Sequence, residues 1–195
     1  MKLISVNAGL PRAVTWHGRT MTTGIFKAPV LTPVRVGLFH LDGDGQADLT
    51  VHGGRAKAVY AYPSEHYTTW RQEAGAPAWP WGTFGENLTT EGLLEDEVRI
   101  GDRFLIGTAE LVVTQPRMPC FKLASKLRRP VIIRRFLTTG RTGWYFAVAR
   151  EGTLQAGDEI VRVARGDEGP SIAELARGTA GEGARIRKDR VRSRS

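Results

Sequence analysis

Short strand-like segments separated by glycine-containing turns make up most of the sequence, and this pattern limits the folds open to the chain. Runs rich in β-branched and aromatic residues occupy residues 2–9, 21–30, 32–46, 97–107, 109–115, 143–152 and 158–165. Their spacing favours a barrel or a sandwich over alternating strand–helix units. The segments 63–75, 120–129 and 131–140 are typical of short helices. We therefore expect a mainly β, barrel-like protein with short helices.

The composition changes near residue 166, where the sequence becomes rich in Gly, Ala, Ser and Arg. We expect a domain over residues 1–166 and an extension over 167–195 that holds one short helix and a basic, disordered tail. The single cysteine excludes an intrachain disulfide, and no apolar run approaches the ~20 residues that cross a bilayer. The first residues lack the apolar stretch of a secretory signal. These features predict a cytoplasmic protein without a membrane partner.

The net charge of +8 is concentrated at the C-terminus. The last eleven residues, RIRKDRVRSRS, hold six basic residues and one acidic residue and so supply +5 of the total. Such a tail, residues 185–195, can bind polyanions weakly and without sequence preference. A solvated terminus with no partner explains the same composition. The charge alone therefore does not define a function.

The segment TQPRMPCFKL places the only cysteine, Cys120, directly after Pro119 and before a predicted helix. Unpaired N–H groups at a helix start, together with Arg117 and Lys122, favour the thiolate form. A thiolate attacks electrophiles or binds a soft metal. The alternative is a buried cysteine that acts as a small apolar residue.

Three glycine-containing loops carry groups able to bind an anion or a heterocycle. Adjacent glycines let a backbone approach a ligand closely, amide side chains both donate and accept hydrogen bonds, and arginine grips phosphate. Each loop also has an ordinary interpretation as a solvated or self-bonded turn. The candidate residues are His52, Gly53, Gly54, Arg55 and Lys57 in HGGRAK, Asn87 in WGTFGENLTTEGL, and Arg141 in TTGRTGWY.

Several common catalytic and metal-binding motifs are absent from the sequence. It contains no CxxC, HExxH, Walker loop or GxSxG element, and its four histidines lack metal-ligand spacing. A structural zinc site is therefore not expected. The remaining candidates, one activated thiol and several cation-bearing loops, suit a phosphorylated cofactor held beside a sulfur ligand.

Four segments in one order resemble the MOSC domain family, and within it the YiiM-like proteins. They are GDGQADLTVHGGRAKAVYAYPSEHYTTW, FGENLTTEGLLEDEVRIGD, TQPRMPCFKL and GRTGWYFAVAREGTLQAGDEI, and the resemblance covers roughly residues 1–165. It implies a β-barrel-like fold that binds the molybdenum cofactor, a pterin dithiolene with a phosphate, and no pyridoxal phosphate. The family's helical C-terminal domain is expected here only in truncated or atypical form.

The resemblance also implies a reductase of N-hydroxylated compounds such as 6-hydroxylaminopurine. Cys120 would be the metal ligand, because only a deprotonated cysteine adds a soft ligand to molybdenum. His52 or Lys57 would supply a proton, and with Asn87 they would line the metal–pterin pocket, while Arg117 and Arg141 would contact anionic groups. The chain lacks a flavin or iron–sulfur motif. An external flavoprotein or ferredoxin-type donor is therefore expected, and a homodimer is compatible with the sequence.

Two other functions fit the same residues. In the first, Cys120 carries a persulfide, and the protein is a sulfur carrier or a molybdenum-cofactor delivery module. In the second, the protein is not an enzyme and binds polyanions through its basic tail. Molybdenum content separates the reductase from the carrier, and deletion of residues 185–195 separates both from the polyanion binder.

Overall fold

The computed structural model describes residues 1–47, 53–74, 78–166 and 168–179, and its architecture is mainly β, as the sequence predicts. The strands are β1 (Lys2–Ala8), β2 (Arg12–Trp16), β3 (Arg19–Thr23), β4 (Ala28–Val30), β5 (Val34–Val36), β6 (Val59–Pro63), β7 (Leu88–Glu91), β8 (Arg103–Ile106), β9 (Ala109–Pro116), β10 (Trp144–Arg150), β11 (Gly152–Leu154) and β12 (Ile160–Ala164). The helical elements are the 3-10 turn η1 (Arg55–Lys57), α1 (Glu65–Ala74), α2 (Phe121–Leu127), α3 (Ile132–Thr139) and a helix over residues 172–179.

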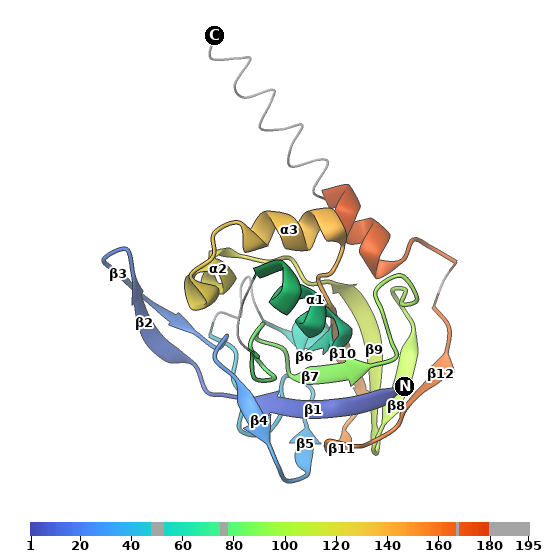
Figure 1. Ribbon diagram of the computed structural model, residues 1–195. Coiled ribbons are helices and arrows are strands. Elements are labelled where there is room, and N and C mark those ends of the chain that lie inside the picture. The colour runs from blue at the N-terminus through green and yellow to red at the C-terminus, as the bar shows by residue number, and fades with distance from the viewer. Residues whose placement is uncertain (48–52, 75–77, 167, 180–195) are drawn as a thin grey trace.

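Eight strands form one mixed sheet in the order β12-β8-β9-β10-β6-β7-β1-β4. The pairing of β6 with β7 is parallel, and the other neighbours in the sheet are antiparallel. Strands β5 and β11 form a separate pair, and β2 and β3 form a hairpin that projects from the body in Figure 1. The helices gather on one side of the sheet (Figure 1). The opposite side faces the core formed by the strands.

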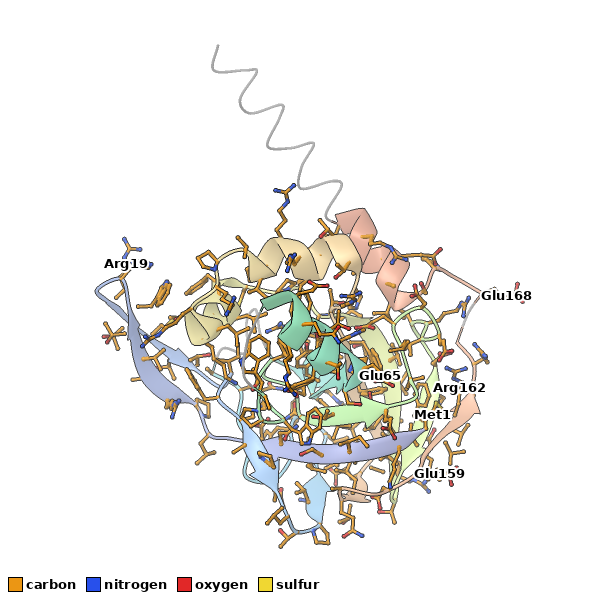
Figure 2. All side chains as sticks on the ribbon, viewed as in Figure 1. Met1, Arg19, Glu65, Glu159, Arg162 and Glu168 are labelled. Atoms are coloured by element: carbon orange, nitrogen blue, oxygen red, sulfur yellow. The ribbon has the colours of Figure 1, made fainter. Side chains whose placement is uncertain are left out.

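The sheet curves like a barrel but is not closed by a continuous strand ladder. The start of β1, the strand next to the edge strand β4, meets the start of β12 where Figure 2 labels Met1 and Glu159. The amide of Leu3 donates to the carbonyl of Asp158, and the amide of Ile160 donates to the carbonyl of Met1, both at 2.9 Å. These bonds join the N-terminal end of β1 to the first residue of β12 and the segment before it, so the expected barrel-like form is confirmed in this partial sense.

Two apolar clusters lie on opposite sides of the sheet. The larger one fills the curved interior with aliphatic residues from most of the strands. The smaller one is aromatic and lies under the helices. In it, the ring of Phe136 in α3 stacks on the rings of Tyr62 and Trp70, with distances between ring centroids of 5.7 and 5.1 Å. Each such buried side chain contributes roughly 1.5–3 kcal/mol. The aromatic cluster therefore fixes α1 and α3 against β6.

The prediction of a continuous loop over residues 81–93 is wrong, because β7 lies inside it. The strand has the polar sequence LTTE, but Thr89 and Thr90 are 0% and 1% exposed. Thr89 accepts a hydrogen bond from the side-chain NH₂ group of Asn7 at 3.1 Å and donates one to Glu86. A buried partner from β1 and one from the preceding loop thus replace the apolar alternation that normally reveals a strand.

The helix over residues 172–179 confirms the short helix expected after residue 166 and packs onto the domain. Ile172 and Ala176 are fully buried, and the amide of Ile172 donates to the carbonyl of Val98 at 2.9 Å. Within the described ranges, no helix is long and apolar enough to cross a membrane. The tail at 185–195 lies outside the described residues.

Candidate functional site

A pocket with a cavity volume of about 100 Å³ opens beside the start of α2. Its wall combines the loop that follows β3, the segment 44–47, η1 with the start of β6, and the segment that joins β9 to α2. Aligned strands and a short helix thus bring together segments that are far apart in the chain. The lining residues with polar or ionisable groups are Thr23, Lys27, Asp44, Gln46, Lys57, Tyr60, Arg117, Cys120, Lys122 and Tyr145.

Cys120 lies at the mouth of this pocket as the N-cap residue of α2. Its backbone is extended, with φ −119° and ψ 173°, and its carbonyl accepts a hydrogen bond from the amide of Leu123 at 3.0 Å. The thiol is free, is partly exposed and makes no capping hydrogen bond. The expected helix start after Pro119 is therefore confirmed, and it presents an accessible sulfur to the pocket.

Arg117 is the most deeply buried cation of the pocket, with only 6% of its surface exposed. It hydrogen-bonds to the side chain of Tyr145, and its guanidinium lies 5.1 Å from the ring centroid of Tyr60. Its Nη1 atom has no hydrogen-bond partner among the described residues. A buried, unsatisfied donor costs about 1–3 kcal/mol or more when charged, so this guanidinium is prepared for an anionic ligand.

The two tyrosines beside Arg117 remain protonated at physiological pH. Burial raises the pKa of Tyr145, and the charge of Arg117 only partly opposes this effect. Burial raises the pKa of Tyr60 as well. The ring centroids of Tyr60 and Tyr145 are 5.4 Å apart. The hydroxyl of Tyr60 already donates to the carbonyl of Thr142 at 2.8 Å. The pocket therefore contains two aromatic rings and the hydroxyl of Tyr145.

Lys27 and Asp44 form a buried ion pair in the opposite wall. Burial lowers the pKa of Lys27, against the attraction of Asp44. Asp44 also accepts hydrogen bonds from the amide of Gly9 at 3.1 Å and from the side chain of Asn87 at 2.8 Å. The pair is thus held in place by three segments and contributes little net charge.

The predicted loop HGGRAK reaches the pocket through Lys57. Lys57 lines the pocket, whereas Arg55 is exposed and is not among the lining residues. Gly54 adopts φ 90°, a conformation that favours glycine, and its amide donates to the side chain of Gln46 at 2.8 Å. Gly53 precedes this turn and is half-buried. The predicted residue His52 lies outside the described residues.

Asn87 lies behind the pocket wall and is not part of the pocket lining. It is 4% exposed, and its side-chain amide donates to Asp44 and to the carbonyl of Asn7 at 3.2 Å. Its side-chain oxygen accepts from the amide of Tyr60 at 3.1 Å. All these partners belong to the protein, so Asn87 contacts the pocket only through Asp44 and Tyr60.

Arg141 is separated from the pocket of Cys120 and lines a different surface depression with His66 and Glu95. Its guanidinium pairs with Glu73 of α1 at 3.2 Å. In the same region, His66 and Glu95 form a buried contact at 2.7 Å. The structure therefore brings Cys120, Arg117 and Lys57 together but places Arg141 elsewhere.

Lys126 anchors α2 to the loops that carry the pocket wall. Its ammonium group donates to the carbonyl of Ile25 at 2.9 Å and to that of Gly82 at 2.8 Å. Burial lowers its pKa to about 8, against the attraction of Glu86. Because Ile25 lines the pocket, this contact fixes the distance between Cys120's helix and the facing wall.

Glu86 organises the loop that precedes β7. Its carboxylate is fully buried and accepts hydrogen bonds from the amides of Gly82 and Phe84, at 2.8 and 3.1 Å, and from the hydroxyls of Tyr67 and Thr89. Burial raises its pKa, while these donors oppose the shift. The adjacent Gly85 lines the pocket, so Glu86 is a structural support for the site.

Among the residues that the structure describes, four cations and one carboxylate line the pocket, so these residues give it an excess of positive charge. The cations are Lys27, Lys57, Arg117 and Lys122, and the carboxylate is Asp44. No group of three or more His, Cys, Asp or Glu residues able to hold a metal occurs in the described part of the chain. The pocket thus offers a single sulfur ligand beside cations suited to an anionic group.

Four residues that line the pocket were not predicted to do so: Lys27, Asp44, Tyr60 and Tyr145. For Tyr145 a signal was present, since Trp144 and Phe146 flank it and alternate residues of a strand face opposite sides. The buried neighbours fill the interior and leave Tyr145 on the helix-covered face. Lys27 and Asp44 gave no comparable signal because their pairing depends on the tertiary fold.

Comparison with known proteins gives a consistent family assignment. The family model described as MOSC domain matches residues 48–161. The uncharacterized protein YflK of Bacillus subtilis (strain 168) is 41% identical over 170 residues, which are 87% of this chain and 76% of YflK. A protein named reductase from Gibberella moniliformis is 35% identical over 161 residues, 81% of this chain but only 28% of the longer protein.

The fold is similar to that of a solved relative over nearly its whole length. The crystal structure of YiiM from Geobacillus stearothermophilus superposes with a TM-score of 0.76 at 39% identity. The match covers 93% of this chain and 84% of that one. Sequence and fold therefore give the same assignment.

Proposed function

This chain belongs to the MOSC domain family, and from that premise we propose that its pocket binds a molybdenum cofactor and that the protein reduces N-hydroxylated compounds to amines. The observation that carries the proposal is the presence of the free Cys120 thiol in the same pocket as the unsatisfied guanidinium of Arg117. A soft ligand and a buried anion site are the two features that a metal-bearing, phosphorylated pterin requires.

The residues of the pocket fit this cofactor. The excess of cations suits the phosphate, and the two tyrosine rings with the hydroxyl of Tyr145 suit a polar, planar heterocycle. When bound, the cofactor would supply the two-electron redox chemistry that no side chain of this pocket provides.

The proposal assigns a task to the thiol, to the cations and to Tyr145 of the pocket. Cys120 holds the metal as a thiolate, Arg117 and Lys122 bind anionic oxygens, and Tyr145 orients the guanidinium of Arg117. Reduction of an N–OH group to an amine consumes two electrons and two protons and releases water. We propose Lys57, which lines the pocket, or His52 as the residue that donates a proton.

The name of the relative from Gibberella moniliformis supports a reductase activity, although that protein is much longer than the region it shares with this chain. We propose aromatic hydroxylamines such as 6-hydroxylaminopurine as the substrate class, because Tyr60 and Tyr145 offer ring surfaces beside the cationic groups. An external flavoprotein or ferredoxin-type protein supplies the electrons.

The decisive experiment measures molybdenum and pterin in protein purified from a cofactor-producing host. Wild type should contain both in near-stoichiometric amounts, and Cys120→Ala should lose most of the metal. Ser125→Ala, in the same helix, is the matched control and should keep it. Reduction of 6-hydroxylaminopurine with dithionite-reduced methyl viologen should follow the metal content.

Two results would overturn the proposal. One is equal metal, or no metal, in wild type and Cys120→Ala although a control molybdoenzyme from the same host is loaded. The other is a persulfide mass shift on Cys120 without metal, which identifies a sulfur carrier.

A further inference from the structure

A stretch of forty residues around Cys120 contains no acidic residue. Residues 111–150 include nine Lys or Arg and no Asp or Glu, between Glu110 and Glu151. With charged residues at 25% of the chain and acids at 20 of 195, a run of this length without a carboxylate marks a region of concentrated positive charge. The fold separates these cations into internal and external groups.

Five of the nine cations line the pocket or bond to other groups of the protein. Arg117 and Lys122 line the pocket, and Lys126 holds the backbone of two loops. Arg135 and Arg141 both pair with Glu73 of α1, at 2.9 and 3.2 Å, so one carboxylate neutralises that side of α3. These residues therefore contribute little free positive charge to the surface near α2.

Three arginines remain on the surface where α2 turns into α3. Arg128, Arg129 and Arg134 are exposed. Within the part of the chain that the structure describes, neither Arg128 nor Arg134 forms an ion pair with a carboxylate. Exposed arginines without an acidic neighbour attract an acidic partner over roughly a Debye length of ~8–10 Å.

Large apolar side chains are exposed beside these arginines. Met118, Phe121 and Val131 are 41%, 57% and 69% exposed. Met118 and Phe121 flank Cys120 in the chain, and Val131 precedes α3, which packs against α2. We call these six residues, Met118, Phe121, Arg128, Arg129, Val131 and Arg134, the α2–α3 patch. Exposed apolar groups together with arginines are characteristic of protein-binding surfaces.

We propose that the α2–α3 patch docks an acidic electron-donor protein that carries a flavin or an iron–sulfur cluster. This inference rests on the proposed function, since the reduction needs two electrons from a partner. The donor is oxidised and supplies two electrons to the site beside Cys120. With two protons, taken up from solvent through the proton donor of the pocket, the substrate N–O bond breaks to give amine and water. Because Met118 and Phe121 flank Cys120 in the chain and Cys120 lines the pocket, a donor bound at these residues lies close to the redox site.

The composition of the α2–α3 patch favours a protein over a nucleic acid. Single-stranded nucleic acids are held by several aromatic side chains on which bases stack, and the patch contains one, Phe121. Met118 and Val131 instead match the apolar centre of a protein interface, with the arginines as its charged rim. Arginine also pairs with carboxylates in a bidentate geometry.

The test uses two acidic probes, a recombinant flavodoxin and a plant-type [2Fe–2S] ferredoxin. Their dissociation constants are measured for wild type, for Arg128→Glu/Arg134→Glu and for the control Lys2→Glu/Arg150→Glu, which makes the same charge change at exposed positions outside the patch. The patch variant should bind at least one probe about tenfold more weakly or worse, and the control should bind like wild type. Wild-type binding should weaken as ionic strength rises from about 50 to about 500 mM.

Activity measurements separate docking from chemistry. With dithionite-reduced methyl viologen, the patch variant should turn over like wild type, whereas its KM for the protein donor should rise about tenfold. Equal binding by the patch and control variants, or no salt-dependent binding of either probe, would overturn the docking site. Tighter binding of a single-stranded oligonucleotide than of both proteins would overturn it as well. Salt-dependent docking by a protein without molybdenum would instead refute only the proposed function.

Discussion

Replacement of Lys126 by methionine tests whether the burial of this ammonium group costs stability at neutral pH. The group lies beneath α2, where burial lowers its pKa from 10.5 to about 8. Below pH 8 it is protonated in both the folded and the unfolded chain, so the burial cost is fully present. Between pH 8 and 10.5 the folded chain releases the proton while the unfolded chain keeps it, and stability rises with pH. The shift corresponds to roughly 3 kcal/mol.

The assay is urea unfolding at several pH values for wild type, Lys126→Met and the exposed control Lys2→Met. Relative to Lys126→Met, wild type should gain about 2–3 kcal/mol of unfolding free energy between pH 7 and pH 10. The loss of the two hydrogen bonds to backbone carbonyls adds a cost to the variant that hardly depends on pH. A stability difference that stays flat over this pH range, or that Lys2→Met reproduces, would refute the reasoning.

Two further substitutions test the scaffold around the site by the same unfolding assay. Glu86→Gln should lower the unfolding free energy by about 1–3 kcal/mol, because an NH₂ group replaces an acceptor oxygen and faces another donor, such as the amide of Phe84. An unchanged urea midpoint would contradict the role of the Glu86 carboxylate in organising the loop before β7. Gly143→Ala should cost about 2–4 kcal/mol, since φ is +64° and the new Cβ would lie 2.2 Å from the carbonyl oxygen of Ala61. Gly157→Ala, with φ +96° but nothing within 4 Å, should cost clearly less, and equal costs would show that the close contact is unimportant.

The strands that the sequence predicted are those whose side chains alternate between interior and surface. The segment WYFAVA is an example, because Trp144, Phe146 and Val148 are buried while Tyr145 and Ala147 are only half-buried. Strand β7 was missed because its threonines are buried although they are polar, and Thr89 bonds to Asn7, which is 82 residues away in the chain. Local sequence contains no information about such partners, so a loop was the natural prediction.

The same limit explains which site residues the structure brings together. Cys120 and Arg117 share one short segment, so a local motif was sufficient to associate them. Asn87 and Arg141 stand in loops with suitable composition, but Asp44 and Glu73 satisfy them across 43 and 68 residues of chain. A polar loop residue can bind a ligand only where the fold leaves its hydrogen-bonding groups unpaired. Sequence composition cannot establish this.

The acid-free stretch explains how one region can provide both a binding pocket and an attractive surface. The carboxylate of Glu73 in α1 pairs with Arg135 of α3 and with Arg141, which follows α3, and so holds both arginines against α1. A carboxylate placed similarly near Arg117 would satisfy its Nη1 atom and compete with an anionic ligand. One placed near Arg134 would neutralise the α2–α3 patch and weaken long-range attraction. Excluding acids from residues 111–150 therefore keeps the pocket and the patch positively charged while Cys120 stands between them.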